Sequence, residues 1–320
     1  MATAPEEVRN QLEFTGGVYG ALNTLRSILE NRSVNAGRVF ACFDHAPPPR
    51  RLRLIPEYKE KRKQRNEEEL YPFETEEQKA AAFGQISQLR DVLQPLGVET
   101  LCYRQREADD IIGALAMHLT SVGETPVIIS SDRDMWQMVG WGCRVWDLYS
   151  HEIIDAGNFN LKTGVSTDTY LLYKAILGDS SDNIPGVHGL GEARTAALFE
   201  AAHWDVRICK EPRDQLAALC DFVGRKKKRT KGERRLLADR KRMEKVLQGI
   251  DLRHSFGPDD RLVEKLGGTP EVDWMAFLRT CKQIGLRNVI GNHQSFLAPF
   301  RQAAGLSRKK PRRTVRKRKA

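Results

Sequence analysis

The chain has 320 residues, of which 40% are hydrophobic, so it is long enough to bury a sizeable core in one or two domains. It contains no apolar run of the roughly 18 residues that a membrane helix needs, and its start, MATAPEEVRN, lacks the basic and apolar regions of a signal peptide. The net charge of +10 favours a polyanionic partner, and the six scattered cysteines are expected to be reduced thiols of a cytoplasmic protein, not zinc ligands.

The first half of the chain alternates between two apolar patterns. Short apolar runs predict buried strands at Arg38–Phe43, Val98–Tyr103 and Pro126–Ser130. Helical periodicity predicts helices at Val18–Leu29, Phe83–Leu96 and Asp109–Leu119. Strands that alternate with helices are typical of an α/β domain with a parallel sheet, which we expect over residues 1–165.

The second half is expected to be mainly helical. The pattern becomes helical near Leu161 and stays so over residues 166–304, apart from a basic run, RKKKRTKGERR, that starts at Arg225. Residues 305–320 contain no acidic side chain and are expected to form a disordered basic tail. Both basic runs suit contact with phosphates, although a merely solvated chain end has the same composition.

Acidic residues follow each of the three predicted strands. The carboxyl ends of parallel strands meet at one edge of a sheet, where ligands bind. On the helix after the second strand, residues three apart share a face, and on an extended backbone residues two apart point to the same side. A further acidic pair follows in the stretch from Gly178. The candidate metal ligands are therefore Asp44, Glu107, Asp109, Asp110, Asp132, Asp134, Asp179 and Asp182.

So many carboxylates cannot lie together in ionised form without cations, and an all-oxygen ligand set favours Mg²⁺ or Mn²⁺ over zinc. Each residue also has a purely structural interpretation. Asp44 could belong to a turn, and Asp109 or Asp110 could be an acid at a helix N-terminus. Composition alone leaves a phosphatase or a kinase-like metal site open, but the chain has no Walker loop.

A glycine-rich stretch, Gly186-Val-His-Gly-Leu-Gly191, precedes a predicted helix at Glu192–Glu200. Backbone N–H groups before a helix N-terminus can hold a phosphate. Many such loops are plain turns, so the stretch gains meaning only from its position just after Asp179 and Asp182.

Taken in order, several stretches resemble the 5′ nucleases: the 5′→3′ exonuclease domain of bacterial DNA polymerase I, the phage 5′ exonucleases and, more distantly, the flap endonucleases. The likeness covers roughly residues 15 to 290, and its most specific part is the last stretch. The matching stretches are Thr15-Gly-Gly-Val-Tyr-Gly-Ala-Leu22, Phe43-Asp44, Pro56-Glu-Tyr-Lys59, Glu107-Ala-Asp-Asp110, Ser131-Asp-Arg-Asp134 and Gly178-Asp-Ser-Ser-Asp-Asn-Ile-Pro-Gly-Val-His-Gly-Leu-Gly191.

The resemblance implies a PIN-like α/β nuclease domain with a helical arch near residues 50–70, followed by a helix–two-turn–helix module at about 184–200. It assigns Asp44, Glu107, Asp109 and Asp110 to a first metal, and Asp132, Asp134, Asp179 and Asp182 to a second. The two ions would be Mg²⁺, for which Mn²⁺ can substitute. Lys59 and Arg62 match basic positions that contact the scissile phosphate. The duplex backbone would bind at Gly186, Val187, Gly189, Gly191 and Arg194, where carbonyl groups often hold K⁺.

One difference from the family affects the expected activity. The family begins with a strand ending in Asp-Gly about twenty residues before the Thr15 stretch, and that aspartate is a ligand of the first metal. In this sequence Glu6, Glu7 and Glu13 do not follow an apolar strand.

We therefore expect a monomeric, structure-specific 5′→3′ exonuclease or flap endonuclease of DNA replication or repair. It would act on DNA 5′ ends, flaps or overhangs in the cytoplasm of a bacterial or phage-infected cell. The alternatives are a weakly catalytic or non-catalytic DNA-structure-binding protein, because the first family aspartate is absent, and a ribonuclease of the PIN type, which the helix–two-turn–helix stretch disfavours.

Overall fold

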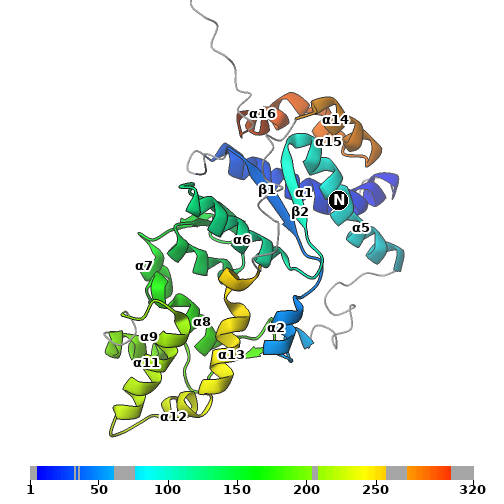
Figure 1. Ribbon diagram of the computed structural model, residues 1–320. Helices are drawn as coiled ribbons and strands as arrows, with labels where there is room; N and C mark the ends of the chain where they lie inside the picture. Colours follow the sequence, from blue (N-terminus) through cyan, green and yellow to red (C-terminus); the bar gives the residue numbers. More distant parts are fainter. Residues whose placement is uncertain are drawn as a thin grey trace, which may run out of the picture. The chain divides into compact units, whose positions relative to one another are not determined.

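The computed structural model describes residues 6–31, 34, 37–60, 76–203, 208–256 and 272–303 (Figure 1). The chain forms two compact units that interleave along the sequence. The first comprises Met1–Ala41, Tyr71–Thr100 and Gly268–Ala320, and the second comprises Cys42–Leu70 and Leu101–Gly267. The boundary expected near residue 165 lies inside the second unit. None of the described helices combines the length and apolar character that crossing a lipid bilayer requires.

The first unit is built mainly from helices. Helix α1 packs against α5 and α16, and α14 packs against α5. Val18 and Leu22 of α1 are fully buried, as the periodicity predicts, although α1 begins twelve residues before the predicted start. The helices of this unit are α1 (Glu6–Glu30), α5 (Glu76–Leu93), a 3₁₀ turn (Gln94–Leu96), α14 (Trp274–Gln283), α15 (Arg287–Gly291) and α16 (His293–Ala303).

The three predicted strands all form, but they belong to two separate sheets. Strands β1 (Val39–Phe43) and β2 (Val98–Cys102) pair in a two-stranded sheet, whereas β3 (Val127–Ser130) belongs to a three-stranded sheet of order β3-β4-β5. Strand β3 pairs with β4 (Arg144–Asp147) in parallel, and β4 pairs with β5 (Glu152–Ile154) in antiparallel. The fold is α/β as expected, and the three predicted strands are divided between two ladders among the described residues. Strands β4 and β5 were not predicted, because four and three residues are too few to show a period.

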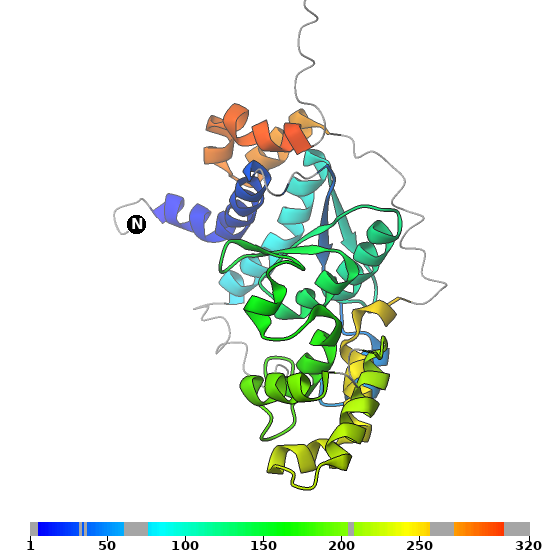
Figure 2. The ribbon, with the colours of Figure 1, turned by 90° about the vertical axis from the view of Figure 1, so that its left-hand side faces the viewer.

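Helix α8 (Tyr170–Leu177) forms the centre of the second unit. Leu172 and Ile176 are inaccessible to solvent, and α8 packs against α9, α11 and α13, as Figures 1 and 2 show. Helix α13 also packs against α2 and so fixes the segment that leads to Lys59. The other helices are α2 (Pro49–Leu54), α6 (Ala108–Ser121), α7 (Phe159–Thr163), α9 (Glu192–Ala201), α11 (Pro212–Arg225), α12 (Lys231–Ala238) and α13 (Arg240–Ile250). Short 3₁₀ segments lie at Arg133–Trp141, Thr167–Thr169 and Leu252–His254.

The basic run interrupts the helical pattern where the sequence indicated. Helix α11 ends at Arg225, and α12 begins at Lys231 with a capping box. The hydroxyl of Thr230 accepts the backbone N–H of Glu233, whose carboxylate accepts the N–H of Thr230 at 2.7 Å. A capping box satisfies two backbone donors at the helix start, so this interruption has a defined geometry.

A two-residue ladder holds the glycine-rich stretch in place. Strand β6 (Gly178–Asp179) pairs in antiparallel with β7 (Ile184–Pro185), which brings Gly186 against the end of α8. A Cβ atom on Gly186 would lie 2.0 Å from the carbonyl oxygen of Leu177, so only glycine fits here.

Gly186→Ala is therefore expected to lower the free energy of unfolding by about 3 kcal/mol, because backbone atoms must move to admit the methyl group. Urea denaturation of the metal-free protein measures the effect. Gly191→Ala is the matched control, since nothing lies within 4 Å of a Cβ atom at Gly191. Equal urea midpoints for the two variants would contradict the prediction.

Candidate metal centre

The acids of the first predicted group surround the N-terminus of α6. The backbone N–H of Glu107, the N-cap residue, donates to Oδ2 of Asp110 at 2.9 Å. The backbone N–H of Ala108 donates to Oδ1 of Asp44 at 2.6 Å. A helix N-terminus favours negative charge, so Asp110 also has the structural role of a helix N-terminal acid, and Asp44 binds the same helix start. The helix start fixes where three of the predicted acids lie.

A buried arginine holds two of these acids together. The guanidinium group of Arg51, in α2, contacts Oε2 of Glu107 and donates to Oδ1 of Asp110 at 2.7 Å. Its Nε donates to the carbonyl oxygen of Gly249 at 3.0 Å, and the Tyr58 hydroxyl donates to Oε2 of Glu107 at 2.9 Å. Nothing in the sequence distinguishes Arg51 from the other two arginines of Arg50-Arg-Leu-Arg53, all of which fall in the segment predicted to form the arch.

Lys59 lies at the same cluster. Its Nζ contacts Oε1 of Glu107 and is 3.9 Å from Oδ1 of Asp182, and its backbone N–H donates to the carbonyl of Asp182 at 2.8 Å. Its φ of 55° is in the left-handed region, which side chains other than glycine adopt rarely and often at functional sites. Burial alone would raise the pKa of Glu107, but Lys59 and Arg51 hold it below the ordinary value. Arg62 lies outside the described residues.

The second predicted group is gathered by a lysine and by short turns. Oδ1 of Asp132 accepts the backbone N–H of Asp134 at 2.8 Å. Nζ of Lys174 lies 2.7 Å from Oδ1 of Asp134 and 3.6 Å from Oδ2 of Asp179. The backbone N–H groups of Ser181 and Asp182 donate to Oδ1 of Asp179. Lys174, which sequence reasoning missed, thus connects acids from two elements.

The two groups meet at one small cavity. Asp109, Asp134 and Asp182 line it together with Arg51 and Tyr58, and its volume of about 10 Å³ is close to that of one water-sized sphere. Among the described residues, no three acids are already close enough to form a metal-ligand set. Carboxylate oxygens are nonetheless the donors that Mg²⁺ prefers, so the residues present fit such an ion.

The pKa of Asp109 shows most clearly that the acidic cluster lacks positive charge. Burial, followed by repulsion from Asp132 and Asp134, raises its pKa to about 8. A carboxyl group in this state favours either a proton or a cation.

In the metal-free protein this shift has a consequence for stability. The folded-state pKa of Asp109 exceeds the ordinary value near 4, so the folded protein binds the extra proton between about pH 4 and pH 8. Stability is therefore expected to fall as pH rises through that window. Asp109→Asn should flatten this part of the profile and raise the unfolding free energy at pH 8 by roughly 1–3 kcal/mol. Thermal unfolding in EDTA from pH 5 to pH 9 measures it, and parallel profiles for wild type and variant would contradict the assignment.

The glycine-rich loop leads into α9 as predicted. Gly189 has a φ of 92°, and its backbone lies directly against Gly232 of α12, where an added Cβ atom would meet Gly189 at 2.8 Å. Arg194 donates to the carbonyl of Gly189 at 3.2 Å, and Arg242 donates to the carbonyl of Gly186 at 3.3 Å. The loop is thus fixed by close backbone packing and by arginines on two helices.

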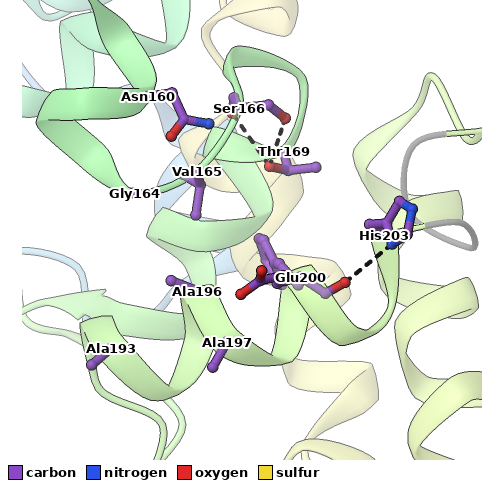
Figure 3. Close-up of a pocket in the computed structure, with 11 residues that line it drawn as sticks. Asn160, Gly164, Val165, Ser166, Thr169, Ala193, Ala196, Ala197, Glu200 and His203 are labelled. Carbon is purple, nitrogen blue, oxygen red and sulfur yellow. Dashed lines mark hydrogen bonds between the residues drawn. The ribbon is translucent and has the colours of Figure 1, made fainter.

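A separate hollow of about 670 Å³ lies between α9 and the segment 160–169 (Figure 3). Ser166 and Thr169 are hydrogen-bonded across one side, and Glu200 and His203 lie on the other. None of the eight predicted carboxylates, all of which the structure describes, lines this hollow. It is distinct from the acidic cavity.

Comparison with known proteins gives consistent matches. Residues 2–164 match the family described as "5'-3' exonuclease, N-terminal resolvase-like domain". The 5'-3' exonuclease of Buchnera aphidicola subsp. Schizaphis graminum is 33% identical over 182 residues, which cover 57% of this chain and 58% of that protein. DNA polymerase I of Pseudomonas aeruginosa is 30% identical over 206 residues, which cover 64% of this chain and 21% of the polymerase. The chain thus spans little more than half of the first relative and about a fifth of the second.

Two solved structures share the fold. The T5 5'-exonuclease with bound divalent zinc ions has a TM-score of 0.58 at 20% identity, with 85% of this chain and 90% of that chain covered. A complex of the bacteriophage T5 flap endonuclease with DNA and metal ions has a TM-score of 0.58 at 19% identity, with 90% of this chain and 91% of that chain covered. At such identities the likeness concerns the fold.

Proposed function

The chain belongs to the 5'-3' exonuclease family with an N-terminal resolvase-like domain, and we propose that it hydrolyses DNA phosphodiester bonds at or near 5′ ends, in replication or repair, with two divalent cations. The observation that carries the proposal is the convergence of Asp109, Asp134 and Asp182 on one cavity. The ammonium group of Lys59 contacts Glu107 of the first acidic group and lies 3.9 Å from Asp182 of the second, so it connects the two groups.

The residues divide into those that would hold cations and those that position them. Asp44, Glu107, Asp109 and Asp110 are proposed for one ion, and Asp132, Asp134, Asp179 and Asp182 for the other. Mg²⁺ suits these oxygen donors, and Mn²⁺ can replace it. When bound, such ions activate water and stabilise the leaving oxygen in phosphodiester hydrolysis.

The positioning residues act on the acids. Arg51 and Tyr58 orient the carboxylate of Glu107, and Arg51 also holds the carboxylate of Asp110, so these two acids at the start of α6 have fixed positions. The ammonium group of Lys59 is proposed to approach the scissile phosphate, where a positive charge stabilises the transition state.

Duplex DNA is proposed to bind beside the glycine-rich loop. The exposed lysines of the turn between α11 and α12, Lys227 and Lys228, precede Lys231, which is adjacent in the chain to Gly232. Because Gly232 packs on Gly189, this basic turn borders the loop. Backbone N–H groups and lysines of this kind contact phosphates without reading sequence. K⁺ at the loop carbonyls belongs to the same proposal.

The direct test is digestion of a labelled duplex with a 5′ overhang. Purified protein should shorten the overhang strand from its 5′ end in Mg²⁺ and should not do so in EDTA. A matched duplex with blunt ends tests whether the protein prefers an overhang. A labelled RNA duplex tests whether it prefers DNA to RNA. Binding without degradation in Mg²⁺ or Mn²⁺ would instead support the non-catalytic DNA-structure binder.

Lys59→Ala tests whether Lys59 acts on the reaction. Single-turnover cleavage is expected to slow by about a hundredfold, because a charge aimed at the reacting phosphate is lost, while duplex affinity changes little. Rapid-quench kinetics and fluorescence anisotropy in Ca²⁺ measure the two quantities. Lys162→Ala, which removes an exposed lysine paired with Glu152, is the control. Equal losses in rate and affinity would make Lys59 a general phosphate contact.

A further inference from the structure

Lys174 is a half-buried cation inside the acidic cluster. It lies in the last turn of α8, between Tyr173 and Ala175, which are both buried. The backbone of this helix is therefore fixed, and the side chain of Lys174 reaches two acids of the second group from it. Its Nζ is 2.7 Å from Asp134 and 3.6 Å from Asp179.

The two acids that Lys174 contacts come from different elements. Asp134 follows β3 in a 3₁₀ segment, and Asp179 belongs to the short strand β6. Two partly buried carboxylates without a cation repel each other and lose their hydration. The ammonium group of Lys174 lies close to an oxygen of each carboxylate and so supplies the positive charge that the pair lacks.

We propose that Lys174 is the counter-cation of Asp134 and Asp179 in the metal-free protein, and that a divalent cation displaces its ammonium group from Asp134 on binding. The inference rests on the proposed function, since Asp134 and Asp179 belong to the second proposed metal group. The ammonium nitrogen lies at hydrogen-bond distance from the carboxylate oxygen that a metal ion at about 2.1 Å would need. The ammonium group of Lys174 and a metal ion cannot occupy the same position beside this oxygen of Asp134.

The contrast with Arg51 supports displacement of the lysine. The guanidinium group of Arg51 is 7% exposed and also bonds to the carbonyl of Gly249, so it has no room to withdraw. Lys174 is 17% exposed and carries its charge on a flexible four-carbon stem with three rotatable donors. Arg51 is thus a fixed part of the cluster, whereas Lys174 can exchange partners.

Chemical labelling of the wild-type protein tests the displacement without any reaction on DNA. Lysines are acetylated briefly with acetic anhydride in EDTA and in saturating Mg²⁺, and labelling is measured by peptide mass spectrometry. Labelling of Lys174 is expected to rise several-fold with Mg²⁺, because its ammonium group leaves the carboxylates. Lys162, paired with Glu152 on the surface, should not respond and serves as the internal control. Unchanged labelling of Lys174 while Mg²⁺ binds would overturn the proposal.

Variants test the competition by calorimetry. Lys174→Met should bind Mg²⁺ about tenfold more tightly than wild type, because no internal cation competes, and should have a lower melting temperature in EDTA. Lys174→Arg restores the charge and should lie near wild type in both measurements, while Lys162→Met should change neither. Equal Mg²⁺ affinity in Lys174→Met and wild type would overturn this inference alone. Absence of Mg²⁺ binding by the wild-type protein would overturn the proposed function as well.

Discussion

Asp182→Ala is expected to slow cleavage of a 5′-overhang duplex by about a thousandfold, because it removes an oxygen donor from the cavity at which both acidic groups meet. The backbone carbonyl of Asp182, which accepts the N–H of Lys59, is retained in the variant, so the fold should persist. Removing one carboxylate from a crowded acidic cluster should leave metal-free stability unchanged or raise it.

Two measurements separate this result from a loss of structure. Single-turnover cleavage in Mg²⁺ gives the catalytic effect, and thermal unfolding in EDTA gives the stability. Asp168→Ala is the matched control, because Asp168 is an exposed aspartate of the same unit that does not line the cavity. Cleavage at the wild-type rate by Asp182→Ala would refute the assignment of this residue to the metal centre.

Arg51→Met is expected to lower the free energy of unfolding of the metal-free protein by about 3–5 kcal/mol. The methionine fills a similar volume but leaves the carboxylates of Glu107 and Asp110 without their shared cation. Asp110 is fully buried, so water cannot take over that role. Breaking one side of a buried ion pair costs far more than removing an exposed charge.

The same helix supplies the control for this variant. Arg53→Met removes an exposed arginine of α2 and is expected to change stability by less than about 0.5 kcal/mol. The double variant Arg51→Met with Glu107→Gln should recover part of the loss, because one of the two uncompensated charges is also removed. Urea denaturation in EDTA measures all three proteins, and similar midpoints for Arg51→Met and Arg53→Met would show that the buried network does not stabilise the fold.

The acidic cluster was predictable because its residues follow strands. A strand of four or five apolar residues fixes the direction of the chain at its end, so Asp44 and Asp132 could be placed from sequence as soon as β1 and β3 were recognised. Helix α6 begins at Ala108, one residue before the predicted Asp109, and Glu107 and Asp110, which were expected to share a face, form its capping box. Short-range rules were sufficient for these positions.

The basic side chains of the cluster, Arg51 and Lys174, were not predictable because their contacts are long-range. Arg51 meets Glu107 across 56 positions of sequence, and Lys174 meets Asp134 across 40, so only the tertiary fold brings them together. Arginines and lysines are usually exposed, and nothing local marks these two as buried. The division of the strands into two sheets was hidden as well, because an apolar run shows that a strand is buried but not which strand pairs with it.

The interleaving of the two units has a consequence for the order of synthesis. The second unit ends at Gly267, so all of its segments are synthesised before α14. The first unit needs α16 as a packing partner for α1, and α16 ends at Ala303. Domains generally fold as units during translation. The metal centre can therefore begin to assemble before α16, a packing partner of α1, has left the ribosome.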